Sequence, residues 1–366
     1  MRSKDELRYW AGFSRIPGIG KARFTILKDY FGSLANAWIA SALALRNAGL
    51  DDATISSIVQ WRSTISPEAE IEAINKYGVR ILTYDSPGYP KLLIEAGDFP
   101  PVLYIRGDLT EQDDCSLAVV GTRRATAYGR QVTEEVVSDL ARLKITIVSG
   151  LAKGIDTVAH RAALNSKGRT LAVFASGLDI VYPPENVNLA REIMENGALV
   201  SEYPLGTKPK AEHFPRRNRI LSGLSRGVLI VESGDASGAL ITANFAIEQD
   251  REVFAIPGSV FSSMSSGPNK LIQEGAKLVR NYIDVIEELN LSVMAEQLEM
   301  KETAASNSTE SLIMKCIGEA PVHIDEICRI SGLNTSSVSS AIAIMELKGT
   351  VRNLGNMCYA LNKSLR

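Results

Sequence analysis

The sequence has few residues that bind metals or form disulfides. Its four cysteines lie far apart with no C-x-x-C pair, and its three histidines are equally scattered. A structural zinc site needs four such ligands held together, and their closely spaced pairs are its usual sequence signature. We therefore expect no metal, and free thiols in a reducing cytosol. The residues concerned are Cys115, Cys316, Cys328, Cys358, His160, His213 and His323.

Long apolar runs and a large net charge are absent as well. No stretch approaches the roughly 18 consecutive apolar residues that a membrane helix needs, and Met1–Glu6 is charged with no apolar run behind it. These features predict a soluble, cytoplasmic protein with no membrane partner. The 40 basic and 42 acidic residues give a net charge of −2, so any surface that binds a polyanion must be local.

Two common nucleotide-binding motifs are missing. The sequence contains neither G-x-G-x-x-G nor G-x-x-x-x-G-K-[ST], which disfavours ordinary NAD binding and Walker-type NTP hydrolysis. A G-x-S-x-G match at Gly223–Gly227 precedes a predicted strand instead of following one, so it does not predict a hydrolase. His160 could pair with Asp156 as acid and base, but we expect its ring to bond nearby backbone. We expect no cofactor and no catalytic residue.

What is present is an alternation of strand-like and helix-like segments between residues 77 and 290. Short apolar runs, of the kind that strands buried on both faces show, alternate with segments of helical spacing. This pattern predicts an α/β domain with a doubly wound, mainly parallel sheet. The predicted strands are residues 79–82, 102–105, 117–120, 145–148, 170–174, 198–200, 228–231 and 253–256, and the predicted helices include 129–143, 155–164, 189–194 and 240–248.

A small all-α domain is predicted before this sheet. Residues 1–76 show only helical spacing, with no strand-like alternation. Ile16–Ala22 joins two of these helices and is typical of a helix-hairpin-helix. The glycine turn of that motif can offer backbone amides to a DNA phosphate, or it can be a purely structural element.

A linker and a small domain are predicted after the sheet. Residues 291–308 are polar and predict the linker. Residues 309–366 predict three short helices and a hairpin, as in a winged helix-turn-helix with its turn at Ser331–Asn334. The second helix of that motif, Ser336–Lys348, carries one basic residue, at its end. We therefore expect this domain to bind protein or to bind DNA poorly.

Small residues follow several of the predicted parallel strands. Ligands bind such sheets at the carboxyl ends of the strands, and glycine turns there aim backbone amides at negative charge. Four such loops on one edge favour a polyanion, although for any one loop a tight turn is an equal alternative. The candidate binding residues are Gly121, Thr122, Arg123, Ser149, Gly150, Lys153, Ser237 and Gly238.

The segment from Gly206 to Arg226 is the most basic part of this region. It holds six lysines and arginines against one acid, Glu212, and an aromatic residue lies in its middle. Basic groups that grip phosphates beside a ring that stacks on a base are typical of single-strand binding surfaces. The alternative is a solvated helix start with the ring in the core. The candidates are Lys210, Phe214, Arg216, Arg217, Asn218 and Arg219.

Taken together, these motifs resemble the DprA/Smf family (DNA-processing protein A). The resemblance runs from about Tyr84 to Val279 and includes Gly121–Arg123, Ser149–Asp156, Phe214–Ile220 and Ser237–Ala243. It implies an extended Rossmann-like domain that binds single-stranded DNA, forms a homodimer and helps load RecA recombinase in natural transformation. It also implies that Arg123 contacts phosphate, that Phe214 stacks on a base, and that three arginines line the groove. These are Arg216, Arg217 and Arg219.

Two other functions stay open at this point. The glycine loops would also suit a mononucleotide phosphate, so a nucleotide-binding or nucleotide-hydrolysing enzyme is an alternative, with Glu232 or Asp235 as acid or base. The loop Val260–Met264 places apolar groups among serines and could be a protein-association surface, or it could pack on its own domain.

Overall fold

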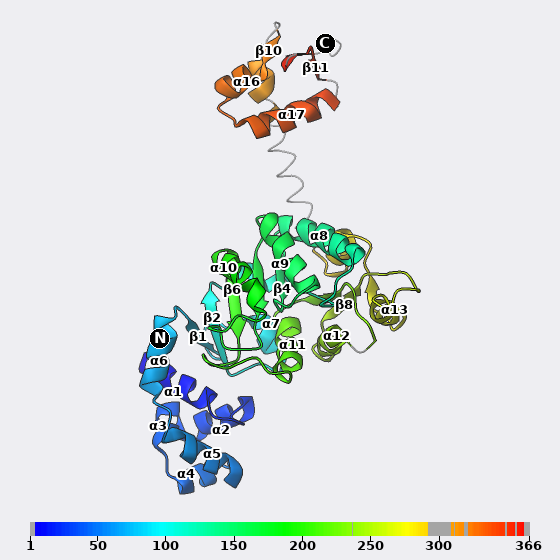
Figure 1. The fold of residues 1–366 in the computed structure, drawn as a ribbon. Coiled ribbons are helices and arrows are strands. Elements are labelled where there is room, and N and C mark those ends of the chain that lie inside the picture. The colour runs from blue at the N-terminus through cyan, green and yellow to red at the C-terminus, as the bar shows by residue number, and fades with distance from the viewer. Residues whose placement is uncertain are drawn as a thin grey trace. The chain divides into compact units, whose positions relative to one another are not determined.

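Figure 1 shows the computed structural model of the protein, in which residues 4–235, 237–291, 309–310, 312–317, 321–347, 350–355 and 357–361 are described. The chain divides into two compact units, residues 1–290 and residues 291–366. The predicted boundary after residue 76 stays a prediction. The predicted linker, apart from Leu291, lies outside the described residues.

Six helices open the first unit, as their spacing predicts. Most of them begin at a side chain that caps the free amides of the first helical turn. The side chains of Ser33, Ser41, Asp51 and Ser66 each accept a hydrogen bond from the backbone amide three residues later. The helices are α1 (Lys4–Ser14), α2 (Lys21–Phe31), α3 (Leu34–Ile39), α4 (Ala42–Asn47), α5 (Asp52–Arg62) and α6 (Pro67–Lys76).

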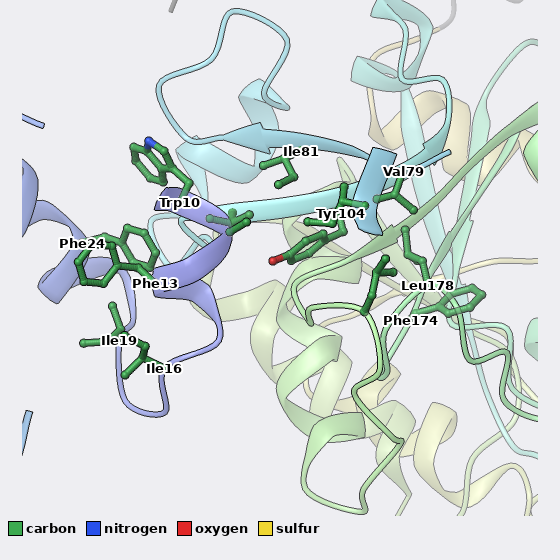
Figure 2. Packing of buried hydrophobic residues seen from close by; sticks show 14 of the residues in the cluster. Trp10, Phe13, Ile16, Ile19, Phe24, Val79, Ile81, Tyr104, Phe174 and Leu178 are labelled. Carbon is green, nitrogen blue, oxygen red and sulfur yellow. The ribbon is translucent and has the colours of Figure 1, made fainter. Parts of the chain in front are cut away.

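These helices share a core with the sheet. Trp10, Phe13 and Phe24 belong to the same buried cluster as Ile81 and Tyr104, which lie on the first two strands of the sheet (Figure 2). The side chain of Ser14 is hydrogen-bonded to the Tyr104 hydroxyl at 2.6 Å. The helical region is therefore packed against one edge of the sheet.

The central sheet has nine strands in the order β1-β2-β6-β5-β4-β3-β7-β8-β9. β1 and β2 pair antiparallel with their neighbours and the other strands are parallel, which confirms the predicted mainly parallel sheet. All eight predicted strands are present, and the short β9 was not predicted. The strands are β1 (Arg80–Thr83), β2 (Val102–Gly107), β3 (Ser116–Val120), β4 (Thr146–Ser149), β5 (Thr170–Val173), β6 (Gly197–Ser201), β7 (Gly227–Ile230), β8 (Glu252–Ala255) and β9 (Lys277–Leu278).

Along the chain, helices connect most of the successive strands. α9 packs against both α8 and α10, while α11 packs against α12. The chain leaves β3 toward β4, and later returns to the other side of β3 as β7, so the strand order reverses between β3 and β7. The helices are α7 (Lys91–Glu95), α8 (Ala127–Arg142), α9 (Ile155–Asn165), α10 (Val187–Asn196), α11 (His213–Gly223), α12 (Gly238–Glu248), α13 (Ser266–Gln273) and α14 (Tyr282–Glu288), with 3-10 turns at Glu111–Asp114 and Pro184–Asn186.

The second unit contains a helix-turn-helix and a three-stranded sheet of order β10-β12-β11. Gly332, in the left-handed conformation at φ 70°, ends α16 at the predicted turn. The exposed residues at the start of α17 are threonine and serines, with no basic side chain among the described residues of that helix. The elements are β10 (Val322–His323), α16 (Ile324–Ser331), α17 (Thr335–Leu347), β11 (Val351–Asn353) and β12 (Cys358–Leu361).

The described residues include neither a membrane-spanning helix nor a cluster of metal-binding side chains. No described helix combines the length and the apolar character that crossing a bilayer requires. No group of three or more histidine, cysteine, aspartate or glutamate side chains within the described ranges is arranged to hold a metal ion.

Candidate nucleic-acid interface

A cavity of about 600 Å³ lies at the carboxyl ends of β3 and β7, where the strand order reverses. This switch point is where doubly wound sheets bind their ligands, because the loops on either side diverge there. Three basic side chains and one carboxylate line the cavity. Its walls include Gly121, Thr122, Arg123, Asp156, Tyr182, Lys210, Phe214, Arg217, Asn218, Ser237 and Gly238.

A cation and two aromatic rings form one wall of this cavity. The guanidinium carbon of Arg123 lies 5.1 Å from the centre of the Phe214 ring. The Tyr182 ring lies 5.6 Å from the Phe214 ring, at an angle of 59°. Arg123 is exposed, Tyr182 is 44% exposed and Phe214 is half-buried, so all three can contact a ligand. The alternative in which Phe214 lies in the core is therefore wrong.

Two loops fix the position of Arg123. Gly154, between β4 and α9, has φ 79°, and a Cβ atom there would lie 2.3 Å from the Thr122 carbonyl oxygen. The Ile155 amide donates to that same oxygen at 3.2 Å. On the other side, the Thr122 amide donates to the Glu232 carbonyl at 2.7 Å. The loop that carries Arg123 is therefore held between the loops after β4 and β7, and glycine at 154 permits the contact.

A buried charge network lies beneath the cavity. Arg217 donates to the carbonyl oxygens of Gly150, at 2.8 Å, and of Val173. The Asp156 carboxylate accepts from the amides of Gly150 and Ala152 at 3.1 and 3.3 Å. Burial raises the pKa of the Asp156 carboxyl, while the positive charge of Arg217 acts to lower it. Burial also lowers the pKa of Arg217 itself, to about 10. Arg217 and Asp156 therefore hold the Gly150 loop from both sides.

The structure brings most of the predicted binding residues to this cavity. The candidates that line it are Gly121, Thr122, Arg123, Lys210, Phe214, Arg217, Asn218, Ser237 and Gly238.

Five candidates lie elsewhere. Ser149 is buried and donates to the Val119 carbonyl at 2.6 Å, while Gly150 is buried beneath the cavity. The Lys153 ammonium bonds Glu185 at 2.5 Å on the surface. Arg216 and Arg219 point away toward Glu202, Arg216 exposed and Arg219 buried.

Sequence reasoning gave no role to Tyr182, which faces the same cavity as Phe214. Tyr182 lies within the part of the chain that resembles the family, Tyr84 to Val279, so a signal was present. Its position beside Phe214 depends on the long connection between β5 and β6, for which the sequence predicts no geometry.

One of the two carboxylates named for the enzyme alternative, Glu232, is already hydrogen-bonded, while the other, Asp235, is exposed. Both carboxylate oxygens of Glu232 accept hydrogen bonds from Thr126, from its amide at 2.9 Å and its hydroxyl at 2.6 Å. The Ser225 hydroxyl is buried and donates to the Leu221 carbonyl at 2.9 Å. Glu232 is therefore a support for the loop before α8, which weakens the enzyme alternative.

His160 is buried and contacts a side chain instead of the expected backbone. Thr170 donates its hydroxyl to the Ile147 carbonyl at 2.7 Å, so His160 Nδ1–H must donate to Thr170 Oγ1, also 2.7 Å away. Asp156 is occupied by backbone amides, so the two do not form an acid–base pair. Burial lowers the pKa of His160 to about 3.

This lowered pKa predicts a loss of stability in mild acid. The unfolded histidine takes up a proton near pH 6.5 but the folded one does not, so the stabilisation is present above pH 6.5 and falls as the pH drops. Between pH 6.5 and 5 we expect the free energy of unfolding to fall by about 1.5 kcal/mol from this group alone. Urea unfolding across this range measures it. A His160→Asn variant that showed the same pH slope would contradict the assignment.

The fold and the cavity define a doubly wound, Rossmann-like protein with a cavity lined by basic side chains at its switch point. Residues 80–290 match the family model of DNA recombination-mediator protein A, and residues 298–357 match the DprA winged helix domain. The chain belongs to the DNA recombination-mediator protein A family.

Relatives of known name agree with this assignment. The chain is 33% identical to Protein Smf of Synechocystis sp., over 98% of this chain and 99% of that protein. It is 46% identical to DNA processing protein DprA of Bacillus subtilis, over 60% and 74% of the two chains.

Two solved structures are similar as well. DNA processing protein A of Streptococcus pneumoniae matches with a TM-score of 0.67 at 34% identity, over 79% of this chain and 99% of that one. The Helicobacter pylori protein, whose structure gives insight into its single-stranded DNA binding mode, matches with a TM-score of 0.52 at 32% identity, over 58% and 97%.

Proposed function

We propose that this protein binds single-stranded DNA in the cavity between β3 and β7, without sequence specificity and without catalysis. One observation carries the proposal: Arg123, Phe214 and Tyr182 form a single wall in which a cation lies beside two accessible rings. A phosphate pairs with the guanidinium and the base beside it stacks on a ring, as in other single-strand binding surfaces.

The aromatic wall favours an unpaired strand over a duplex. In a duplex the faces of the bases are covered by their neighbours, so rings such as Phe214 and Tyr182 have nothing to stack on. Stacking also tolerates any base, because every base has such a face. The Helicobacter pylori relative, with the same fold, is known for single-stranded DNA binding, which supports the proposal.

A Tyr182→Ala variant tests the role that the structure adds. Loss of one stacking ring at a half-exposed position should weaken binding of a labelled single-stranded oligonucleotide by about 5- to 10-fold. A Tyr182→Phe variant keeps the ring and should bind as the parent does, because the hydroxyl is not part of the argument. Fluorescence anisotropy measures both. Equal affinities of the alanine variant and the parent would remove Tyr182 from the site.

Oligonucleotide sequence tests the lack of specificity. Oligothymidylate, oligodeoxycytidylate and a mixed-sequence strand of equal length should bind within a few-fold of one another. A strong preference for one defined sequence would instead require hydrogen-bond readout of base edges, which the described lining residues do not explain.

The family supports a proposal for the wider role. We propose that the protein acts as a cytoplasmic homodimer that helps load RecA recombinase onto single strands in natural transformation. Exposed apolar side chains on the sheet unit support an association surface: Phe261 is 96% exposed and Val260 83%, so the loop 260–264 does not pack on its own domain at these positions. Sedimentation tests the dimer. Faster assembly of RecA filaments on single strands when the protein is added tests loading.

A further inference from the structure

A second cavity, of about 340 Å³, lies where the N-terminal helices meet loops of the central sheet. The turn between α1 and α2 forms one wall, and the loops before β2 and after β6 form others. Four basic side chains line it against two carboxylates. The basic residues are Arg15, Lys21, Arg216 and Arg219, and the acidic residues are Asp98 and Glu202.

Helix α11 separates this second cavity from the first. Phe214 and Arg217 line the first cavity, while Arg216 and Arg219, on another face of the same helix, line the second. Arg216 is exposed at the surface between them, with its guanidinium 3.6 Å from Glu202. Arg216 therefore offers an exposed positive charge on α11 to a strand that passes from the first cavity to the second.

The turn at the second cavity is the predicted helix-hairpin-helix. Ile16 and Ile19 anchor it in the core (Figure 2), and Gly18 adopts φ 84° between them. Gly20 caps α2 without a side chain, so the amides of the first turn of the helix have no capping partner in the described structure. Lys21 reaches across to the Gly97 carbonyl at 2.6 Å, which ties the turn to the sheet unit.

Two buried polar atoms on the opposite wall lack a partner. Within the described residues, Glu202 Oε1 and the Tyr203 hydroxyl make no hydrogen bond. The Glu202 side chain is 6% exposed and Tyr203 is 8% exposed, so neither is solvated as a surface group would be. Buried polar groups normally have a partner, and both residues line the cavity.

We propose that the second cavity binds the next stretch of the same DNA single strand, with a phosphate at the α2 N-terminus and Arg216. The Tyr203 hydroxyl can donate to that strand and Glu202 Oε1 can accept from a base N–H group, such as the N3–H of thymine. This inference rests on the proposed function, because it extends the strand that the first cavity holds.

Gly20 offers a sharp test. A Cβ atom there would meet nothing within 4 Å and the backbone is extended, so Gly20→Asp and Gly20→Asn both fit and both cap α2. The two variants differ only in charge. The probes are labelled oligothymidylates from about 6 to about 30 nucleotides, bound to the full chain; the shortest are meant to fill one cavity.

For long strands, we expect Gly20→Asp to bind about 3- to 10-fold more weakly than Gly20→Asn, with a salt slope smaller by about 0.7 because one phosphate contact is lost. Short strands should bind both variants alike. If parent and both variants bind every length equally, the second cavity is not a subsite, and the proposed function stands. If the parent binds no length, both proposals fail.

A second pair of variants tests whether a loss of affinity comes from a change in folding. Pro17 is exposed and lines the same cavity, so Pro17→Glu and Pro17→Gln repeat the comparison at a different backbone position. Thermal unfolding of each variant shows whether it is folded. A length-dependent loss with both acidic variants supports the subsite, and its absence in the folded Pro17→Glu variant overturns it.

Discussion

The double variant Arg123→Ala, Phe214→Ala is expected to lose about 100- to 1,000-fold in affinity for single-stranded DNA while staying folded. One stacked base contributes about 1–3 kcal/mol, and a hydrogen bond to a charged phosphate contributes about 1.5–3 kcal/mol. Arg123 and Phe214 lie against each other on the cavity wall, so the double change removes both contacts from one nucleotide. Anisotropy titrations with a labelled oligothymidylate measure the loss.

Matched controls separate this effect from general loss of charge or ring. Arg124 is the next residue along the same loop and is exposed, but it does not line the cavity. Tyr30 is 54% exposed on the N-terminal helices. Arg124→Ala and Tyr30→Ala should each change affinity by less than about 3-fold, which is about what one phosphate-tracking charge contributes. If a control variant lost as much affinity as the double variant, binding would depend on overall charge and not on this wall.

Arg217→Met is expected to have the largest effect on stability. Arg217 is 4% exposed. Its removal takes a hydrogen-bond donor from the carbonyls of Gly150 and Val173, and it takes from the buried Asp156 a positive charge that favours the ionised carboxylate. Removing one member of a buried charge network costs about 3–5 kcal/mol. Urea unfolding at neutral pH should show this as a lower midpoint. DNA binding should then be lost through unfolding.

The neighbouring residue provides the comparison. Arg216 has an exposed side chain that lies near Glu202 at 3.6 Å. Arg216→Met should change the free energy of unfolding by less than about 0.5 kcal/mol, as most surface substitutions do, yet weaken DNA binding. Equal stability of the two variants would show that Arg217 does not support the Gly150 loop.

The strands were predictable because their sequences are simple. Strands buried on both faces are short, apolar and partly β-branched, and β3, β4 and β7 all read this way. The shared position of the glycine loops was predictable as well, because loops that follow parallel strands lie together at one edge of the sheet. The edge strand β9 has only two residues, which is too short to give a periodic signal.

The roles of the three arginines could not be read from composition alone. Arg216, Arg217 and Arg219 looked equivalent as members of a basic segment, but they lie on one helix and therefore on different faces. Positions 214, 217 and 221 share the face toward the first cavity, and 216 and 219 share another. Helical spacing from Phe214 would have separated them. Burial of Arg217 depends on the Gly150 loop, which is distant in sequence.

The dependence of DNA affinity on salt, measured side by side for a single strand and its duplex, tests the central claim most directly. Two of the basic side chains that line the first cavity, Arg123 and Lys210, are exposed, so the logarithm of the association constant for the single strand should fall with a slope of about −1.4 against the logarithm of salt concentration. The single strand should bind at least about 10-fold more tightly than the duplex, because only an unpaired base can stack on Phe214. No binding to single strands at low ionic strength, or equal binding to the duplex, would contradict the account.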